Sequence, residues 1–172
     1  SLADDALSQV ANSIIRLQEL ATQAASSTLS ESQRAGIGAE VAQIRNTLIT
    51  LANARDSAGN ALFGGESAGA AYALDAAGNA TYIGTAQAPS VALGDGQSVT
   101  RGLTGPEFLQ FTSGGASLDL LAVTKDLADA LQGGTGSAAA ANAALAALGD
   151  GLDAVTTAQT VIGARLNWID LN

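Results

Sequence analysis

The sequence of 172 residues contains no cysteine and no histidine, which restricts the chemistry that its side chains can perform. It therefore has no disulfides, no Cys/His zinc site and no Ser-His-Asp or Cys-His nucleophile. A hydrolase built from this sequence would need two facing carboxylates. Most Asp and Glu residues fall on the polar faces of predicted helices, where a solvated surface accounts for them. We therefore predict no enzyme activity, no catalytic residues, no metal site and no cofactor.

Two kinds of glycine-rich segment resemble ligand-binding loops but are better interpreted as turns. Residues 133–136 precede a predicted helix and could cradle a phosphate, but the lysine that a P-loop requires does not follow them. Residues 75–79 and 94–96 resemble fragments of calcium loops, yet they lie where turns are expected between strands. All three segments are predicted to be connections rather than binding sites.

The charge balance excludes further classes of protein. The chain has 16 acidic and 7 scattered basic residues, a net charge of −9, which argues against nucleic-acid binding because phosphate contacts need clustered Lys and Arg. No run of about 18 apolar residues is present, so no membrane insertion is expected. The hydrophobic fraction of 47% includes 38 alanines, which suit closely packed helices better than a bulky core.

The first half of the sequence predicts a helical hairpin. Apolar residues recur at alternating steps of four and three from Ala3 to Ala24 and again from Ile37 to Leu51, which is a heptad stripe. Between the stripes, Ser30 and Gln33 have the spacing of a capping box, which marks the start of the second helix. The predicted seam residues of this half are Leu7, Val10, Ile14, Leu17, Ile37, Val41, Ile44 and Leu48.

Helices are predicted again after residue 112, first over 119–131 and then over a longer stretch that begins near Ser137. The seam residues of the last helix are Leu145, Leu148, Leu152, Val155 and Ile162. Gln159 is the polar member of this seam, either a tolerated polar residue near a helix end or solvent, or a polar contact that sets the register in an assembly. Gly149 and Gly151 predict a kink or a close backbone contact, because glycine is costly inside a helix.

The stripes do not fade at either end of the sequence. We therefore expect a trimmed core fragment, in which both terminal helices continue in a longer parent protein. The two helices are expected to pair with each other, which would place both termini at one end of the fold. Such a fragment is expected to be monomeric in solution.

Between the helical parts, the pattern changes to that of β-strands, and five of the six aromatic residues lie between Phe63 and Phe111. Hairpins are predicted over 71–83 and 90–101, followed by a strand over 108–111. The predicted fold is mainly α with an inserted small β domain, the helices forming an elongated antiparallel bundle or coiled coil. The expected domains are 1–66 and 112–172 for the bundle and 67–111 for the insert.

Several short motifs are similar to those of bacterial flagellins and their relatives, and above all to the hook-associated protein of the hook–filament junction. The segment 31–41 resembles the family's opening of the second helix, 51–65 has the spacing Leu-Ala-Asn…Gly…Leu-Phe-x-Gly, and 163–167 resembles Gly-Ala-Arg-x-Asn. The resemblance covers about two thirds of the chain. The motif residues are Arg34, Glu40, Leu51, Asn53, Gly59, Phe63, Gly65, Gly163, Arg165 and Asn167.

This resemblance implies a structural protein of the extracellular flagellum that serves motility. Its implied partners are the other junction protein, filament flagellin, copies of itself in a ring and a flagellar export chaperone. It also implies secretion through the flagellar type III system, which needs no cleaved signal peptide.

Three alternatives remain open at the level of the sequence. The chain could be a filament flagellin, a near neighbour in the same class. It could instead be a binding module whose β insert recognises a glycan or a host surface. The third alternative is the carboxylate-based hydrolase described above.

Overall fold

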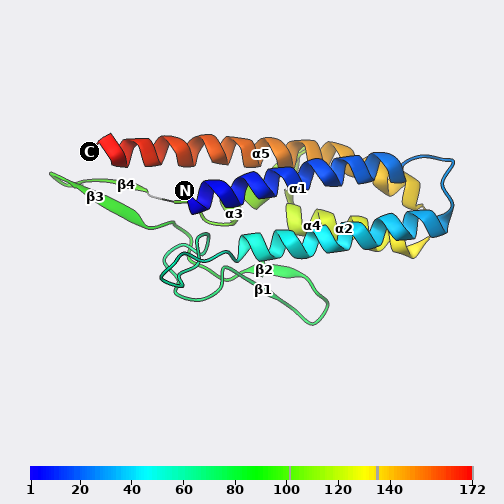
Figure 1. Ribbon diagram of the computed structural model, residues 1–172, viewed down its shortest axis with the longest axis horizontal. Coiled ribbons are helices and arrows are strands. Elements are labelled where there is room, and N and C mark those ends of the chain that lie inside the picture. Colours follow the sequence, from blue (N-terminus) through cyan, green and yellow to red (C-terminus); the bar gives the residue numbers. More distant parts are fainter. Residues whose placement is uncertain (101, 135, 172) are drawn as a thin grey trace.

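The computed structural model describes residues 1–100, 102–134 and 136–171. Two long helices open the chain, α1 (Leu2–Ala24) and α2 (Glu31–Ala52). Two more close it, α4 (Leu120–Gly133) and α5 (Ser137–Leu171). Between them, the described residues form three two-stranded hairpins and the short helix α3 (Pro106–Leu109) (Figure 1). The predicted fold class, mainly helical with an inserted β part, is confirmed.

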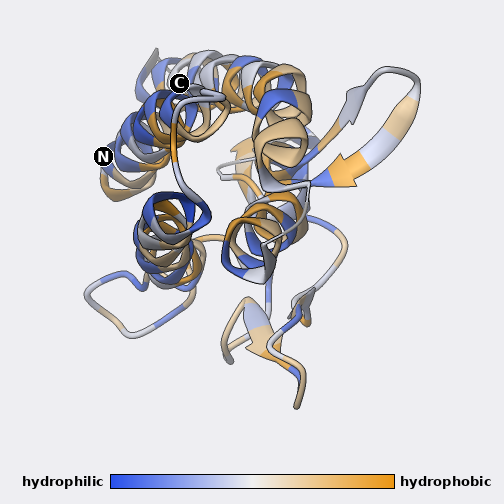
Figure 2. Cartoon of the chain, turned by 90° about the vertical axis from the view of Figure 1, so that its right-hand side faces the viewer, coloured by the Kyte–Doolittle hydropathy of each residue, from blue (hydrophilic) through white to orange (hydrophobic). Residues whose placement is uncertain are grey.

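The four long helices form an elongated bundle around a common core. α1 packs on α5 and α2, and α4 packs on α2 and α5, so that the helices surround a shared centre when viewed along the bundle (Figure 2). The exposed surface of 8473 Å² exceeds the roughly 7,700 Å² expected for a compact monomer of this mass, in keeping with the elongated shape. Both ends of the chain lie at the same end of the bundle (Figure 1), as predicted.

Side chains cap three of these helices at their N-termini. Ser1 accepts a hydrogen bond from the backbone N–H of Asp4 at the start of α1. The capping box predicted for α2 is present: Ser30 Oγ accepts from Gln33 N at 3.1 Å, and Gln33 Oε1 accepts from Ser30 N at 2.8 Å. Asp119 caps α4 by accepting from the backbone N–H groups of Leu121 and Ala122. Because these donors have no partners within the helix, each cap contributes to fixing where its helix starts.

The predicted seams of α1 and α5 face the core. Leu7, Val10, Ile14 and Leu17 of α1 are fully buried, as are Leu148, Val155 and Ile162 of α5. Leu145 and Leu152 are half-buried and pack against the same core. The seam of the two helices also contains a polar contact, since Gln159 Nε2 donates to Ser8 Oγ of α1 at 2.9 Å. Gln159 is thus hydrogen-bonded within the chain, and its role in an assembly stays a prediction.

The buried side of α2 differs from the predicted stripe. Val41 and Leu48 are buried as expected, but Ile37, Ile44 and Leu51 are only half-buried. The fully buried line includes Arg34, Gly38 and Arg45 in their place. The hydrophobic pattern did not predict these buried positions, because the face of α2 that packs between α1 and α4 contains two arginines and a glycine.

Glycine permits close packing against a helix at two positions. A Cβ on Gly38 would lie 2.8 Å from Leu131 Cβ, so only glycine lets α2 and α4 approach this closely. On α5, a Cβ on Gly151 would lie 3.2 Å from Phe111 Cε1. The close neighbours of Gly151 are thus side chains rather than the backbone contact predicted for the glycine pair of α5, and Gly149 has no such close neighbour.

The first two hairpins occur where the sequence predicts them. β1 (Tyr72–Leu74) pairs with β2 (Ala80–Tyr82) across a five-residue loop. β3 (Ser90–Gly94) pairs with β4 (Gln97–Thr100), although Arg101, the last residue of the predicted strand, lies outside the described residues. Thr135 of the predicted helix connection 133–136 also lies outside them.

The predicted strand over 108–111 is wrong in its first half. Pro106 to Leu109 form the helix α3, because proline is favoured in a first helical turn and Gly105 precedes it. Gln110 and Phe111 belong to β5 (Gln110–Ser113), which pairs with β6 (Ala116–Asp119) in a third hairpin that the sequence patterns did not predict. This hairpin packs on α5 through β5.

Candidate assembly site at the join of bundle and insert

Many of the motif residues gather where the bundle meets the insert. We call this region the join and define it as residues 53–72 and 102–109. The join has an aromatic centre in which Phe63 and Phe108 are fully buried. Their ring centroids lie 4.8 Å apart with an interplanar angle of 65°, an edge-to-face arrangement that is favourable beyond simple burial. A backbone hydrogen bond from Gly105 N to Phe63 O, at 2.8 Å, ties the two halves of the join together.

Asn53 connects α2 to the first hairpin of the insert. It is the C-cap of α2, and its side-chain amide makes two hydrogen bonds to the backbone of Tyr72. Asn53 Nδ2 donates to Tyr72 O at 3.1 Å, while Tyr72 N donates to Asn53 Oδ1 at 2.8 Å. An amide side chain offers both donors and an acceptor. Asn53 therefore pairs with both the backbone N–H and the backbone C=O of Tyr72, as a residue of a neighbouring strand would.

Two motif glycines of the join adopt backbone conformations that other residues disfavour. Gly59 has φ +87° and its carbonyl accepts from Arg55 Nη1 at 2.7 Å. Gly65 has φ +70°, and a Cβ there would overlap Thr85 Oγ1. Glycine is therefore required at Gly65 on both conformational and steric grounds.

Arginines fasten the helices to the connecting segments by donating to backbone carbonyls. Arg34 Nε donates to Ala24 O at 2.9 Å and Arg34 Nη2 to Ser26 O at 2.7 Å, which satisfies carbonyls at the end of α1. Arg165 Nη1 of α5 donates to Gly102 O at 2.6 Å and lies 3.8 Å from Glu107 Oε2. Both residues belong to the predicted motif set, and both act as cross-links between a helix and a loop.

Arg45 makes a third cross-link that sequence reasoning missed. Its Nε donates to Leu121 O of α4 at 2.8 Å, and its Nη2 donates to Gly78 O in the β1–β2 loop at 2.9 Å. Burial lowers the pKa of this guanidinium, and the nearby carboxylates of α4 and its cap partly oppose that effect. The sequence could have predicted the burial of Arg45 from its position, since Arg45 follows Arg34 and Val41 at helical spacing along one face of α2.

The remaining motif residues lie apart from the join. Glu40 is exposed on α2 and pairs with Arg16 of α1 at 2.8 Å, and Leu51 is half-buried against the core. On α5, Asn167 is exposed and a Cβ on Gly163 would contact nothing within 4 Å. The structure thus brings together one group of motif residues: Asn53, Gly59, Phe63, Gly65 and Arg165. The assembly role of the whole set stays a prediction.

The hydroxyl of Tyr72 is buried and, among the described residues, has no hydrogen-bond partner. A buried unpaired polar group is unfavourable, so Tyr72→Phe is expected to raise the free energy of unfolding by about 1 kcal/mol at neutral pH, measured by urea denaturation. The control is Tyr82→Phe, because the Tyr82 hydroxyl donates to Thr85 O at 2.5 Å and its loss should destabilise. Equal destabilisation by both substitutions would contradict this prediction.

The buried hydroxyl of Tyr72 should also make the stability of the protein depend on pH in alkaline solution. Burial raises the pKa of its hydroxyl above the ordinary 10.0. As the pH rises past about 10, the unfolded chain therefore loses this proton before the folded chain does. Stability should fall above that pH by up to about 1.4 kcal/mol per pH unit, and Tyr72→Phe should reduce the slope.

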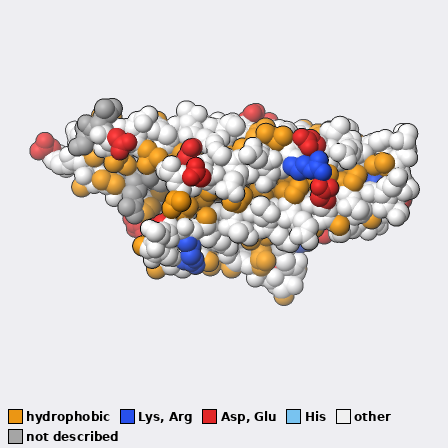
Figure 3. Space-filling view, in the orientation of Figure 1, with side chains coloured by type: hydrophobic (Ala, Val, Ile, Leu, Met, Phe, Trp, Pro, Cys, Tyr) orange, Lys and Arg blue, Asp and Glu red, His pale blue; other side chains and the backbone are white. Residues whose placement is uncertain are grey.

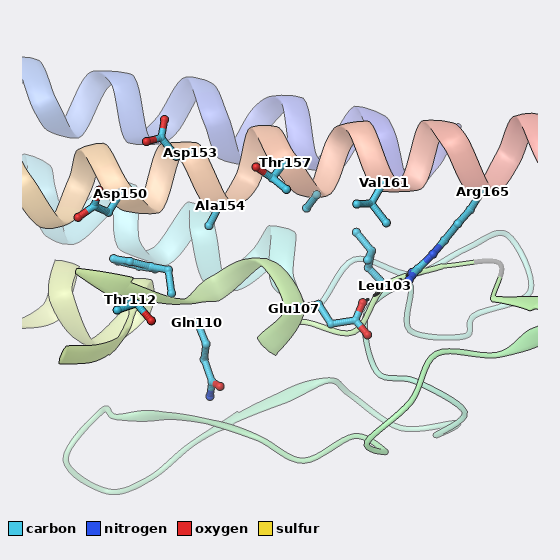
Figure 4. A pocket seen from close by; sticks show the side chains of 12 residues that line it. Leu103, Glu107, Gln110, Thr112, Asp150, Asp153, Ala154, Thr157, Val161 and Arg165 are labelled. Carbon is cyan, nitrogen blue, oxygen red and sulfur yellow. Dashed lines mark ion pairs between the residues drawn. The ribbon is translucent and has the colours of Figure 1, made fainter. Parts of the chain in front are cut away.

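Beside the join lies a groove of about 570 Å³ between α5 and the segment formed by α3 and β5. Phe111, Ala158 and Val161 contribute apolar surface, and Asp150 and Asp153 line it from α5. In Figure 4 the side chains of Glu107 and Arg165 point toward one another at one end of the groove. The described part of the chain contains no group of three or more side chains that could hold a metal ion. None of its described helices has the length and hydropathy to cross a bilayer.

The comparisons with known proteins give a clear result for the fold. No protein-family model and no curated protein sequence matches the chain. FlgL from Xanthomonas campestris matches with a TM-score of 0.89 and 19% identity, over 98% of this chain and 86% of that one. The flagellar junction protein FlgL from Legionella pneumophila matches with a TM-score of 0.87 and 18% identity, over 99% and 91%. A putative flagellar hook-associated protein from Vibrio parahaemolyticus matches with a TM-score of 0.84 and 25% identity, over 98% and 75%.

The bundle and its inserted hairpins are therefore the fold of the flagellar hook-associated proteins. Within this class, the chain resembles the hook–filament junction protein FlgL. The resemblance predicted from the sequence motifs is confirmed by these structures.

Proposed function

We propose that the chain is a structural protein of the bacterial flagellum that joins the hook-side junction protein to filament flagellin. The observation that carries this proposal is the match of the fold over 98% or more of the chain to proteins described as flagellar hook-associated or junction proteins. The chemistry of the described residues supports a structural role, because the arginines and the asparagine of the join bond to the protein's own backbone.

In this proposal, the helices mediate axial packing and the insert faces outward. Residues 1–66 and 112–172 supply the bundle domain, and 67–111 supply the insert. The motif residues of the join hold the two parts in a constant orientation, and the seam residues keep the terminal helices paired. The partners are the other junction protein, filament flagellin and copies of the chain in a ring. A flagellar export chaperone and the type III channel deliver it to the extracellular flagellum, and it has no catalytic role.

Deletion of the gene in its source bacterium tests this proposal. We expect hooks to form normally, filaments to be absent, and flagellin to accumulate in the medium, measured by electron microscopy and immunoblotting. Restoration of filaments by the wild-type gene is the control. Intact filaments in the deletion strain would overturn the proposal, and loss of the filament protein itself would identify a flagellin.

A further inference from the structure

We propose that Asp95, at the tip of the β3–β4 hairpin, is a site of spontaneous backbone modification, where it converts to isoaspartate through a cyclic imide formed with Gly96. The chain contains two Asp-Gly dipeptides, Asp95-Gly96 and Asp150-Gly151. A glycine after an aspartate leaves the backbone nitrogen open to the aspartate side chain, because no Cβ shields it. Both dipeptides are therefore candidates by sequence, and the structure separates them.

The first dipeptide is the turn of an exposed hairpin. Asp95 and Gly96 connect β3 to β4 with φ angles of +51° and +76°, the signs of a type I′ turn. Both residues are exposed, and a Cβ on Gly96 would meet nothing within 4 Å. Figure 1 shows the hairpin extending away from the bundle, and in the space-filling view of Figure 3 an acidic side chain stands at its tip. Water therefore has free access to the reacting groups.

The two reacting groups of this turn are not held by hydrogen bonds. Within the described part of the chain, the Asp95 carboxylate accepts none and the backbone nitrogen of Gly96 donates none. The aspartates of two other turns differ. Asp56 Oδ1 and Asp75 Oδ1 each accept hydrogen bonds from two backbone N–H groups of their own loops. Those carboxylates must break two bonds before they can turn toward the backbone, whereas that of Asp95 is free to do so.

The backbone of the tip can also move into the geometry that ring closure requires. β3 and β4 form a sheet of only two strands, and such a hairpin has little stability of its own. Asp95 already has a positive φ, which is uncommon for a residue with a side chain. Opening of the turn therefore costs little free energy, and it allows the Asp95 carboxyl carbon to approach the nitrogen of Gly96.

The second dipeptide lies inside α5 and is held on every side. In a helix the backbone N–H of Gly151 donates to the carbonyl four residues earlier, so its nitrogen is engaged. Asp150 Oδ2 accepts a hydrogen bond from Ser113 Oγ. Gly151 is buried, and a Cβ there would lie 3.2 Å from Phe111 Cε1. Ring closure at this position requires the helix to unwind, which makes Asp150-Gly151 an internal control.

The proposed reaction needs no reactant besides water. The backbone nitrogen of Gly96 attacks Cγ of the protonated Asp95 carboxyl, and an N–Cγ bond forms. The carboxyl OH leaves with the hydrogen of the attacking nitrogen as water, which closes a five-membered imide. Water then adds to either imide carbonyl, and one of the two C–N bonds breaks. Cleavage of the N–Cγ bond restores aspartate, while cleavage of the bond to the main-chain carbonyl carbon gives isoaspartate.

The product changes the end of the hairpin. In isoaspartate the main chain runs through the former side-chain carboxyl, which adds one carbon to the turn and leaves the former main-chain carboxyl as the side group. A turn lengthened in this way no longer matches the pairing of Gly94 with Gln97. The modification therefore alters the shape of the most exposed end of this hairpin without changing the mass of the chain.

Incubation of the purified chain in mildly acidic oxygen-18 water tests the proposal. Each passage through the imide inserts one oxygen-18 atom, and peptide mapping by mass spectrometry with electron-transfer fragmentation locates both the label and the isoaspartate. We expect both to accumulate at residue 95 at least about tenfold faster than at residue 150, because a lone hairpin opens more easily than a packed helix. Equal accumulation at the two positions, or none at residue 95, would overturn the proposal.

A pair of matched substitutions tests whether Gly96 supplies the nucleophile. Gly96→Asn places a Cβ beside the attacking nitrogen with a residue that tolerates positive φ, so it should lower the isoaspartate yield at residue 95 several-fold. Gly94→Asn is the control, because it makes the same change at the positive-φ glycine on the other side of Asp95 and should not lower the yield. An unchanged yield in Gly96→Asn, or an equal decrease in Gly94→Asn, counts against the proposal. The measurement uses the chain alone, so its result is independent of the deletion test.

Discussion

Phe63→Ala is expected to lower the free energy of unfolding by about 4 kcal/mol, more than any other single substitution proposed for this protein. Phe63 is fully buried at the centre of the join and packs edge-to-face on Phe108. Truncation removes most of a large apolar side chain and leaves a cavity that the surrounding helices cannot fill. The loss includes about 1 kcal/mol from the aromatic pair itself. Urea denaturation followed by far-ultraviolet circular dichroism measures this change.

The matched control for Phe63 is Ile83→Ala. Ile83 is a large apolar residue of the insert, but its side chain is 52% exposed, so its truncation should change stability by no more than about 0.5 kcal/mol. A loss below about 1.5 kcal/mol for Phe63→Ala would show that the join is not a packed core. Hydrogen bonds, such as those from the side chains of Asn53 and Arg45, would then be the main connection between the bundle and the insert.

Arg45→Met is expected to destabilise the protein by about 2 kcal/mol. Methionine keeps much of the apolar stem of Arg45 but removes the donors to Leu121 O and Gly78 O. Hydrogen bonds to charged groups stabilise by about 1.5–3 kcal/mol each, and the relief of burying a cation offsets part of that loss. The buried position of Arg45 and the lowered pKa of its guanidinium are consistent with that offset.

The Arg45 substitution should have a local effect that a general loss of stability would not produce. Because Arg45 ties the β1–β2 loop to α2, amide hydrogen exchange in residues 72–82 should accelerate more than exchange in α1. Arg55→Ala is the control, since Arg55 is exposed and its loss should cost about 0.5 kcal/mol or less. Uniform acceleration across the chain would contradict a specific role of Arg45 in holding the hairpin.

These two residues explain how an alanine-rich bundle can hold an insert in place. Alanine buries little area, so the helices gain stability mainly from length and close approach, as at Gly38 and Gly151. At the join, the packing of aromatic side chains and a hydrogen bond from an arginine to a backbone carbonyl take the place of alanine packing. The junction role proposed above requires this rigidity, because the proposed ring would have to present both of its faces in a constant orientation.

Local patterns in the amino-acid sequence were sufficient to predict the helical elements and the first two hairpins. The heptad stripes of α1 and α5, the capping box at Ser30 and the loop of the first hairpin depend on contacts between residues a few positions apart. The motifs also indicated the family, because Asn53, Gly59, Phe63 and Gly65 follow one another within a short segment. Such patterns can be recognised in a sequence because their physical causes are local.

Contacts between distant parts of the chain could be found only in the folded structure. Arg45 reaches Leu121 and Gly78, and Gln159 reaches Ser8, over separations that no periodicity encodes. The buried face of α2 also differs from its hydrophobic stripe, since an arginine can be buried when backbone carbonyls accept its hydrogen bonds. The groove beside α5 has the same origin: its carboxylates come from α3 and α5, and only packing of the helices brings them to one apolar floor.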